Sequence, residues 1–168
     1  PDARGVAFVP AFAGLGAPHW DADARGLITG ITLGASRAEL ARATFESVAH
    51  QVADVIGQVA ATLGVDERLT VHADGGATRS DMLCQLVADL SDVDLLRSDD
   101  AETAAVGAAH FAGLTAGMWS SLDELAEVHR NTTLVSPQMD ASDRNAARGR
   151  WAEAVDRART TKTSEVTQ

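Results

Sequence analysis

The residues with the clearest chemical potential form the segment LTVHADGGATRSDMLCQL, at positions 69–86. Residues 69–73 alternate as a strand does, and residues 74–77 (DGGA) predict a tight turn before a helix at 79–90. Ligands of α/β sheets bind outside the carboxyl ends of strands, and free N–H groups at a helix start attract anions. One interpretation of the segment is a nucleotide seated against Gly75 and Gly76, where no Cβ blocks the backbone. A turn that only reverses the chain would have the same pattern.

Other candidate chemistry in the sequence is weak. No Walker A, GxSxG or HExxH motif is present, so any nucleotide binding is not of the P-loop type. The histidines lack the spacing of metal ligands, and we predict no metal site built from this chain. The single cysteine, Cys84, lies in an apolar helical stretch and predicts a buried thiol. A chain without disulfides suits a reducing compartment, and we expect a cytoplasmic protein.

The elements that must position the turn follow from hydrophobic periodicity and turn residues. Helical spacing predicts helices at 36–63, 79–90, 102–117, 122–128 and 140–159. Short apolar stretches predict strands at 6–10, 27–32, 69–73 and 93–96, and residues 131–137 are irregular or extended. This alternation predicts an α/β fold with a partly parallel sheet covered by helices. We expect one domain over residues 1–159 and a disordered tail over residues 160–168.

The longest predicted helix starts at Ser36, which has capping-box spacing with Glu39, and ends at Gly64. A second capping box, Ser121 with Glu124, precedes the helix at 122–128. Apolar residues at steps of three and four predict one broad buried face on the longest helix. They are Leu40, Ala43, Phe45, Val48, Val52, Ile56, Val59 and Leu63.

Composition places the chain among globular proteins and argues against two classes of partner. Of its 168 residues, 45% are hydrophobic and 23% are charged, which is enough to build a core. The formal net charge of -10 repels nucleic acid and anionic lipid, so we expect neither as a partner. No apolar run reaches the roughly 18 residues that cross a bilayer. Because the chain starts without Met and enters a strand at once, we expect a fragment or a processed product.

Longer segments of the chain resemble the FGGY family of carbohydrate kinases. Residues 26–46, GLITGITLGASRAELARATFE, fill one family signature: G-x-apolar-x-G-apolar, a seven-residue gap, then acidic-apolar-x-x-Ala-x-aromatic-acidic. Residues 8–26, 71–77 and 102–119 match further family segments in the expected order. The resemblance extends over about residues 6–159 and identifies the C-terminal domain of such a kinase.

The resemblance implies a ribonuclease H-like fold of the actin, Hsp70 and hexokinase type, incomplete at its N-terminal side. Such enzymes transfer the γ-phosphoryl group of ATP, bound with Mg²⁺, to a sugar or polyol hydroxyl. The resemblance places Gly75, Gly76 and Ala77 against the nucleotide, with Gly76 beside its phosphate and ribose region. Ser80 occupies the position where the family usually has Asn beside the adenine. Serine departs from that pattern because it lacks the paired donor and acceptor of an amide.

The resemblance also implies that much of the enzyme lies outside this chain. The general base, the first phosphate-binding hairpin and the polyol contacts would all precede Pro1, so no catalytic residue is expected here. Mg²⁺ would be held mainly through phosphates and by residues elsewhere. We therefore expect an inactive fragment whose partner is the N-terminal domain of the same kinase, and whose exposed surfaces favour a homo-oligomer.

The acceptor and the role of the chain remain open between three hypotheses. The PAFAGLGAP form of the loop at 10–18 favours the glycerol kinase branch of the family. A pentulose kinase, acting on xylulose or ribulose, is the second. A non-catalytic nucleotide-binding or scaffold module is the third, and Ser80 is compatible with it.

Overall fold

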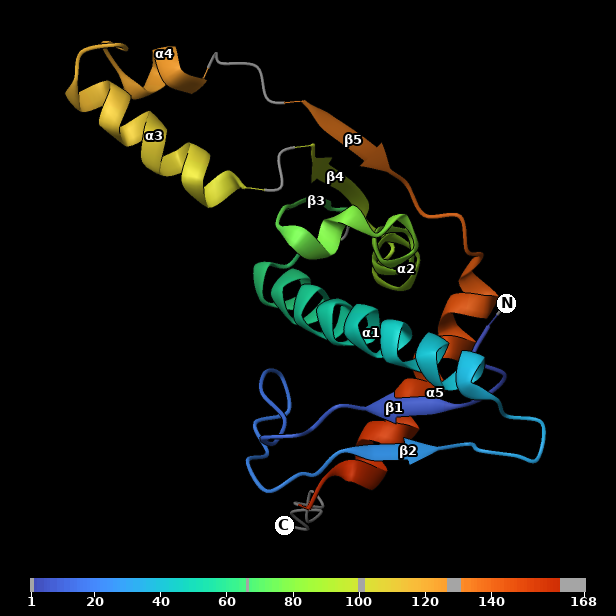
Figure 1. Ribbon diagram of the computed structural model, residues 1–168. Helices are drawn as coiled ribbons and strands as arrows, with labels where there is room; N and C mark the ends of the chain where they lie inside the picture. Colours follow the sequence, from blue (N-terminus) through green and yellow to red (C-terminus); the bar gives the residue numbers. More distant parts are fainter. Residues whose placement is uncertain (1, 66, 100–101, 127–130, 161–168) are drawn as a thin grey trace.

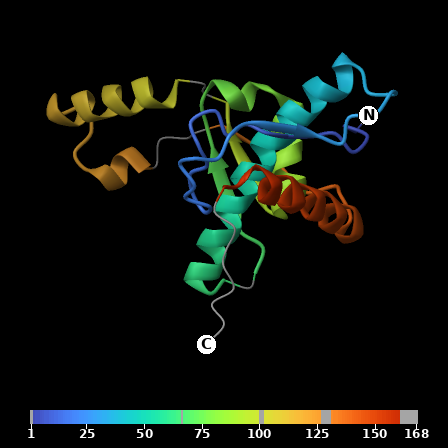
Figure 2. The ribbon, with the colours of Figure 1, turned by 90° about the horizontal axis from the view of Figure 1, so that it is seen from below.

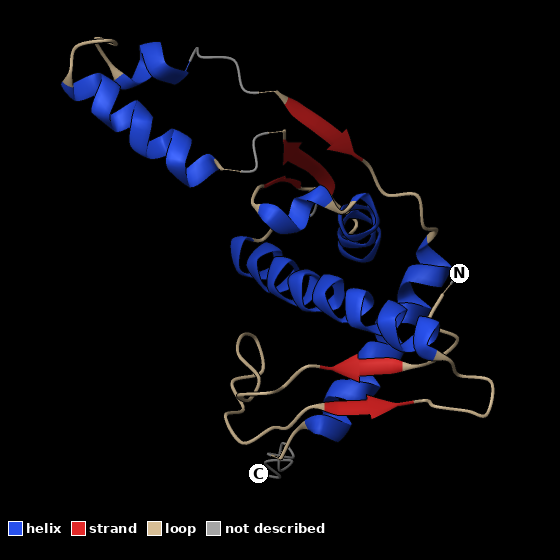
Figure 3. Ribbon diagram, in the orientation of Figure 1, coloured by secondary structure: helices blue, strands red, loops and turns tan. Residues whose placement is uncertain are grey.

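The computed structural model describes residues 2–65, 67–99, 102–126 and 131–160. It contains two separate sheets, drawn red in Figure 3. The smaller sheet pairs β1 (Ala7–Val9) with β2 (Leu27–Thr29) in antiparallel fashion. The larger has the order β3-β4-β5, formed by β3 (Thr70–Ala73), β4 (Asp94–Ser98) and β5 (Thr132–Val135). β3 and β4 are parallel and β5 is antiparallel to β4, which confirms an α/β fold with a partly parallel sheet.

The strand β5 lies in a segment whose conformation the sequence did not determine. Residues 131–137 were expected to be irregular or extended, and Thr132–Val135 pairs with the outer side of β4. Leu95 lies opposite Val135, and both pack on the main core. The pairing brings a segment distant in sequence to the edge of the sheet, which periodicity over four residues could not show.

The long helix α1 (Arg37–Leu63) has the predicted ends. The Ser36 hydroxyl accepts a hydrogen bond from the Ala38 N–H, and the Glu39 carboxylate accepts from the Ser36 N–H at 2.8 Å. These bonds with Ser36 lower the pKa of Glu39. Gly64 closes the helix with a φ of 64°. The capping box and the left-handed glycine thus fix the boundaries as the sequence indicated.

The buried face of α1 differs from the predicted one. The large apolar residues expected inside include Phe45, Val48 and Leu63, which are 40%, 41% and 68% exposed. The helix instead buries small or polar side chains, because α2 packs along it on one side and β1 and α5 approach it on the other (Figure 1). The buried residues are Ala43, Ser47, Ala49, His50 and Ala53. Phe45, Val48 and Leu63 thus lie on a side of α1 that the described residues leave partly exposed.

Two helices complete the body. α2 (Asp81–Ser91) packs along α1 and contributes Leu86, Ala88 and Leu90 to a core that also contains Leu95 of β4. α5 (Ala141–Ala158) packs beneath β1 and β2, with Trp151 and Val155 buried among residues of the first loop. Among the described residues, no helix has the length and apolar character needed to cross a membrane.

An arm made of α3 (Thr103–Thr115) and α4 (Leu122–Ala126) extends away from this body (Figures 1 and 2). Its exposed apolar residues include Phe111, Met118 and Leu122. The second capping box is only half as predicted. The Ser121 hydroxyl accepts from the Glu124 N–H at 3.1 Å, but the Glu124 carboxylate accepts from the N–H of Ser120, at 2.6 Å. The return bond is displaced by one residue, and bonds with Ser120 lower the pKa of Glu124.

Two aspartates fasten the loop at residues 10–25. Asp21, 4% exposed, accepts from the N–H of Ala24 at 3.0 Å and from the N–H of Thr160 at 2.8 Å. Thr160 is the first residue of the predicted tail, and residues 161–168 lie outside the described part of the chain. Asp54 of α1 contacts His19 in this loop at 3.4 Å and accepts from the Trp151 indole N–H at 2.8 Å. The loop is therefore tied to both α1 and α5.

Candidate functional site

The predicted glycine turn, residues 74–80, lies at the carboxyl end of β3. Gly75 has a φ of 92° and a ψ of 175°, and a short 3-10 helix, η1 (Gly76–Arg79), follows it. Ser80 then caps α2. Because β3 is parallel to β4, this is the end of the sheet at which α/β proteins bind ligands.

The turn is open to solvent at its two glycines. A Cβ built at Gly75 or at Gly76 would meet no atom within 4 Å. Within the described part of the chain, no hydrogen-bond acceptor faces the N–H groups of Gly76 and Ala77. The backbone is therefore bare and accessible, as an anion-binding turn requires.

Hydrogen bonds of Thr78 hold the turn in place. The Thr78 hydroxyl donates to the Gly75 carbonyl at 2.8 Å, and the Thr78 N–H donates to the same oxygen at 3.1 Å. The Thr78 carbonyl accepts from Arg97 Nη1 and from Cys84 Sγ, both at 3.3 Å. Cys84 is 2% exposed, which confirms the predicted buried thiol and gives it a role beneath the turn. The glycines thus sit on a fixed support although nothing covers them.

Arg97 is the site residue that the sequence did not reveal. The predicted strand stopped at Leu96, whereas β4 continues to Ser98 and pairs Arg97 with Ala73, the last residue of β3. The Arg97 guanidinium is hydrogen-bonded to the Asp81 carboxylate, and this bond raises the pKa of Arg97. A predicted strand that continued to Ser98 would have placed the Arg97 guanidinium beside the turn.

A cavity of about 480 Å³ opens next to this cation. It lies between η1, the end of β4 and the start of α3, and its wall is mostly polar and charged. The lining residues are Thr78, Arg79, Asp81, Arg97, Ser98, Asp99, Glu102 and Val106. The cavity is therefore adjacent to the turn, but Gly75, Gly76, Ala77 and Ser80 are not part of its wall.

The four predicted contact residues are close in sequence and differ in availability. Gly75, Gly76 and Ala77 form the exposed bend, whereas Ser80 lies at the far end of η1. The Ser80 hydroxyl accepts a hydrogen bond from the Leu83 N–H at 3.3 Å as the N-cap of α2. A side chain engaged in capping has less freedom to contact a base. Among residues 2–65, 67–99, 102–126 and 131–160, no three His, Cys, Asp or Glu side chains form a metal-binding cluster.

Residues 1–116 match the family described as the FGGY family of carbohydrate kinases, C-terminal domain. The chain belongs to the FGGY family of carbohydrate kinases. The match includes the glycine turn, β3, β4, α1 and α2. A family member of this kind has a ribonuclease H-like fold, and the arrangement of helices around the β3–β4 pair agrees with it.

Within the FGGY family, the chain is more similar to glycerol kinases than to a xylulose kinase, as three comparisons show. A glycerol kinase of Halobacterium salinarum is 48% identical over 153 residues, which are 91% of this chain and 30% of the relative. The structure of Plasmodium falciparum glycerol kinase with ADP is 31% identical with a TM-score of 0.83, and matches 96% of this chain and 32% of that one. A xylulose kinase of Rhodospirillum rubrum, covering 91% of this chain and 30% of its own, is 26% identical with a TM-score of 0.64. The FGGY kinase chain thus spans about a third of the length of the proteins it matches.

Proposed function

We propose that this chain is the C-terminal, nucleotide-binding part of an ATP-dependent glycerol kinase. The 48% identity to a glycerol kinase carries the proposal, because it runs through 91% of the chain. The open turn at the carboxyl end of β3 supports it, since bare amides suit the phosphates of a nucleotide. The cytoplasm is the compartment that we infer for such an enzyme.

In this proposal the chain binds and orients, and other parts of the polypeptide catalyse. The N–H groups of Gly76 and Ala77 contact the phosphates of ATP, while Thr78, Cys84 and Arg97 keep the turn in position. ATP supplies the transferred group. Mg²⁺ bound with ATP would neutralise part of the phosphate charge, and we infer that residues outside this chain would hold it. The base that orients the glycerol hydroxyl also lies outside, so the chain alone transfers no phosphoryl group.

A pentulose kinase is the second candidate. Its support is the xylulose kinase likeness, which is weaker in both identity and TM-score than the glycerol kinase likeness. A non-catalytic nucleotide-binding or scaffold module is the third, and its support is the serine at position 80 with its hydroxyl already engaged. Phosphotransfer measurements separate all three.

The decisive experiment uses a fused kinase. It joins the part of the Halobacterium salinarum relative that precedes the aligned segment to the present 168 residues. With ATP we expect glycerol to be phosphorylated at least about tenfold faster than xylulose or ribulose. Faster turnover of a pentulose would establish the second candidate. ADP binding without any phosphotransfer would favour the third, and the 168-residue chain alone serves as the inactive reference.

A substitution at the turn tests where the nucleotide binds. Gly76→Val adds a branched side chain in open space, so the fold tolerates it, but the side chain projects where phosphates would approach. We expect the fused kinase to lose at least about tenfold in ADP affinity by calorimetry, since about 1.4 kcal/mol corresponds to tenfold. Gly57→Val is the matched control, because Gly57 of α1 is also open within 4 Å and is distant from the turn in sequence. Equal affinities for the two variants would exclude this turn as the site.

A further inference from the structure

One ring nitrogen of His50 has no partner among the described residues. The ring is 7% exposed and stacks on Trp151, with centroids 5.1 Å apart. Arg148 Nη1 donates to His50 Nδ1 at 3.1 Å, since a guanidinium has donors only, and a neutral ring that accepts at Nδ1 carries its hydrogen on Nε2. Burial, and next the Arg148 charge, lower the pKa of His50 to about 3, so the ring is neutral at neutral pH. The Nε2–H group is therefore a donor without an acceptor in the described part of the chain.

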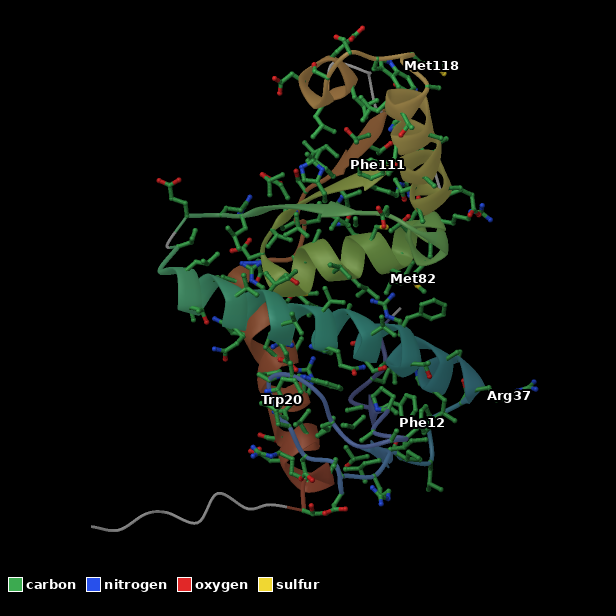
Figure 4. All side chains as sticks on the ribbon, turned by 90° about the vertical axis from the view of Figure 1, so that its left-hand side faces the viewer. Phe12, Trp20, Arg37, Met82, Phe111 and Met118 are labelled. Carbon is green, nitrogen blue, oxygen red and sulfur yellow. The ribbon has the colours of Figure 1, made fainter. Side chains whose placement is uncertain are left out.

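His50 lines a cavity of about 250 Å³ beside the N-terminal half of α1. The rest of the wall comes from the N-terminal segment 2–6, the C-terminal half of α2 and the segment 139–150, which includes the first half of α5. Figure 1 shows the N-terminus and the start of α5 beside the start of α1, and Figure 4 shows α2, marked by Met82, along one side of α1. A recess of about 40 Å³ adjoins the cavity and also has His50 in its wall. Arg148 borders neither space, so the ring edge that faces them is the one that carries Nε2.

Arg150 supplies a second free donor. Three arginines line the cavity, and two of them, Arg4 and Arg42, pair with glutamates of α1 at 3.7 Å and 2.7 Å. Arg150 forms no ion pair or hydrogen bond in the described part of the chain. Its charge lies near enough to His50 to contribute to the low pKa of the ring, after burial and the Arg148 charge. The cavity thus has two neighbouring donors, one of them charged, that lack an acceptor.

We propose that this cavity binds a small aliphatic carboxylate, with one oxygen on the His50 Nε2–H group and the other on the Arg150 guanidinium. A carboxylate accepts hydrogen bonds only, and its charge-assisted bonds to a guanidinium are among the strong ones in proteins. Leu86, Leu90 and Met139 line the same cavity and suit the apolar part of such a molecule. The site is independent of the proposed function, because its wall shares no residue with the glycine turn or with the cavity next to that turn.

Other occupants fit the wall less well. A dianion such as phosphate would be repelled by Glu46 and Asp143, which also line the cavity. A cation would face two donors and an unpaired arginine. Water accepts from the Nε2–H group but brings no charge to match Arg150. The volume of about 250 Å³ corresponds to about eight water molecules of roughly 30 Å³ each, so the ligand has only a few carbon atoms.

Calorimetry with sodium butyrate tests the site. We expect saturable binding to the 168-residue chain and to the fused kinase, with a dissociation constant below about 1 mM. Butanol, butylamine and inorganic phosphate are the controls, because they change the charge of the ligand, and each should bind at least about tenfold more weakly. Absence of saturable butyrate binding, or equal affinity for any control, would overturn the proposal. Binding to the 168-residue chain but not to the fused kinase would also overturn it, because the remainder of the polypeptide would then fill the cavity.

Arg150→Gln tests the charged contact. Arg150 is exposed on α5, so the fold tolerates the change while the guanidinium is lost. We expect the affinity for butyrate to fall at least about tenfold. Arg157→Gln is the matched control on the same helix, because Arg157 lies outside the cavity and donates to Thr29 Oγ1 at 3.1 Å. Its affinity for butyrate should equal that of the wild type, and equal affinities of the two variants would overturn the assignment of the carboxylate to Arg150.

The His50 ring provides a readout that charge attraction at the surface does not change. In proton NMR spectra of the imidazole groups, we expect saturating butyrate to shift the His50 Nε2–H signal and to slow its exchange with water at least about tenfold. In Arg150→Gln the same concentration of butyrate should leave the signal in place. An unchanged His50 signal in the wild-type chain with butyrate bound would show that the carboxylate stays outside the cavity, and would overturn the proposal.

Discussion

Two groups of glycines look alike in sequence and differ in what surrounds them. A Cβ at Gly14 would meet the Ala22 backbone at 2.7 Å, and one at Gly30 would meet the Gly5 carbonyl oxygen at 2.0 Å. At Gly75 and Gly76 nothing lies within 4 Å. The first group is glycine because the protein's own backbone fills the space. The second group leaves that space empty, which is the condition for a ligand.

The same contrast extends to the polar residues around each group. The loop at 10–25 is held by the buried carboxylate of Asp21 and by the partly buried carboxylate of Asp54, which contact residues from other parts of the chain. The glycine turn is held by bonds of Thr78 to the Gly75 carbonyl and to Arg97, and by the bond of the Ser80 N–H to the Ala77 carbonyl. The packed loop at 10–25 is suited to support the fold, whereas the open amides of the glycine turn are suited to bind a ligand. Substitutions in the packed region should therefore change stability, and substitutions in the turn should change ligand affinity.

The largest effect is expected for Gly30→Ala. The new methyl group would overlap the Gly5 carbonyl, and the φ of 76° is unfavourable for alanine. Overpacking and backbone strain together should lower the free energy of unfolding by about 4 kcal/mol, measured by urea denaturation. Gly64→Ala is the control, because Gly64 has a φ of 64° and open space. It should lose only about 1 kcal/mol, and an equal loss in both variants would show that Gly30 is not packed as described.

Asp54→Asn should have the next largest effect. The carboxylate contacts Arg148 and accepts from Trp151, and its side chain is 12% exposed. An amide leaves the largely buried Arg148 guanidinium without its counter-charge, and the free energy of unfolding should fall by about 3 kcal/mol. Asp156→Asn is the exposed control and should change stability by less than about 0.5 kcal/mol. A loss in Asp54→Asn no larger than in the control would contradict the role of Asp54 in fastening the loop.

Acid should weaken the same packed region through His50. Its ring is 7% exposed, stacks on Trp151 with centroids 5.1 Å apart, and accepts from Arg148 at Nδ1. Burial, and next the Arg148 charge, lower the pKa of His50 from 6.5 to about 3. Below the unfolded pKa only the unfolded chain gains the proton, so stability is full above it and is lost as the pH falls toward the folded value.

Between about pH 7.5 and pH 5, this group should remove about 2 kcal/mol from the free energy of unfolding. His50→Gln keeps an acceptor for Arg148 and does not titrate, so subtracting its profile isolates the histidine from the carboxylates. Parallel stability profiles of the two proteins would show that His50 is not the group responsible.

The sequence predicted those parts of the fold that local chemistry determines. Ser36, Glu39 and Gly64 set the ends of α1 through bonds between neighbours in sequence. The buried side of α1 was predicted only in part. Ala43 is buried and Val52 packs on the core, but periodicity alone ranked Phe45 and Val48 above Ser47 and His50, because which residues are covered depends on the elements that pack there. Phe45, Val48 and Leu63 lie on a side of α1 that the described residues leave partly exposed.

The sequence predicted the backbone part of the candidate site, the glycine turn, but not the Arg97 side chain beside it. Gly75 and Gly76 follow from a strand, a turn and a helix start in succession, and all three are local. Arg97 is 21 to 22 residues further along the chain, and reaches the turn only because β4 pairs beside β3. The alternation of strands and helices predicted the parallel pairing, but the apolar pattern ended at Leu96 and therefore left Arg97 outside the predicted strand.

Ser80→Asn should have the smallest effect on stability, and it tests whether the turn governs ligand affinity separately from stability. Asparagine caps a helix about as well as serine, so the free energy of unfolding should change by less than about 0.5 kcal/mol. Its amide also offers a donor and an acceptor, so ADP affinity of the fused kinase should rise by about threefold to tenfold in calorimetry. Ser80→Ala is the control: it loses the bond to the Leu83 N–H and about 1 kcal/mol of stability, without any gain in affinity. Unchanged affinity in Ser80→Asn would place the base away from Ser80 and limit the turn's role to the phosphates.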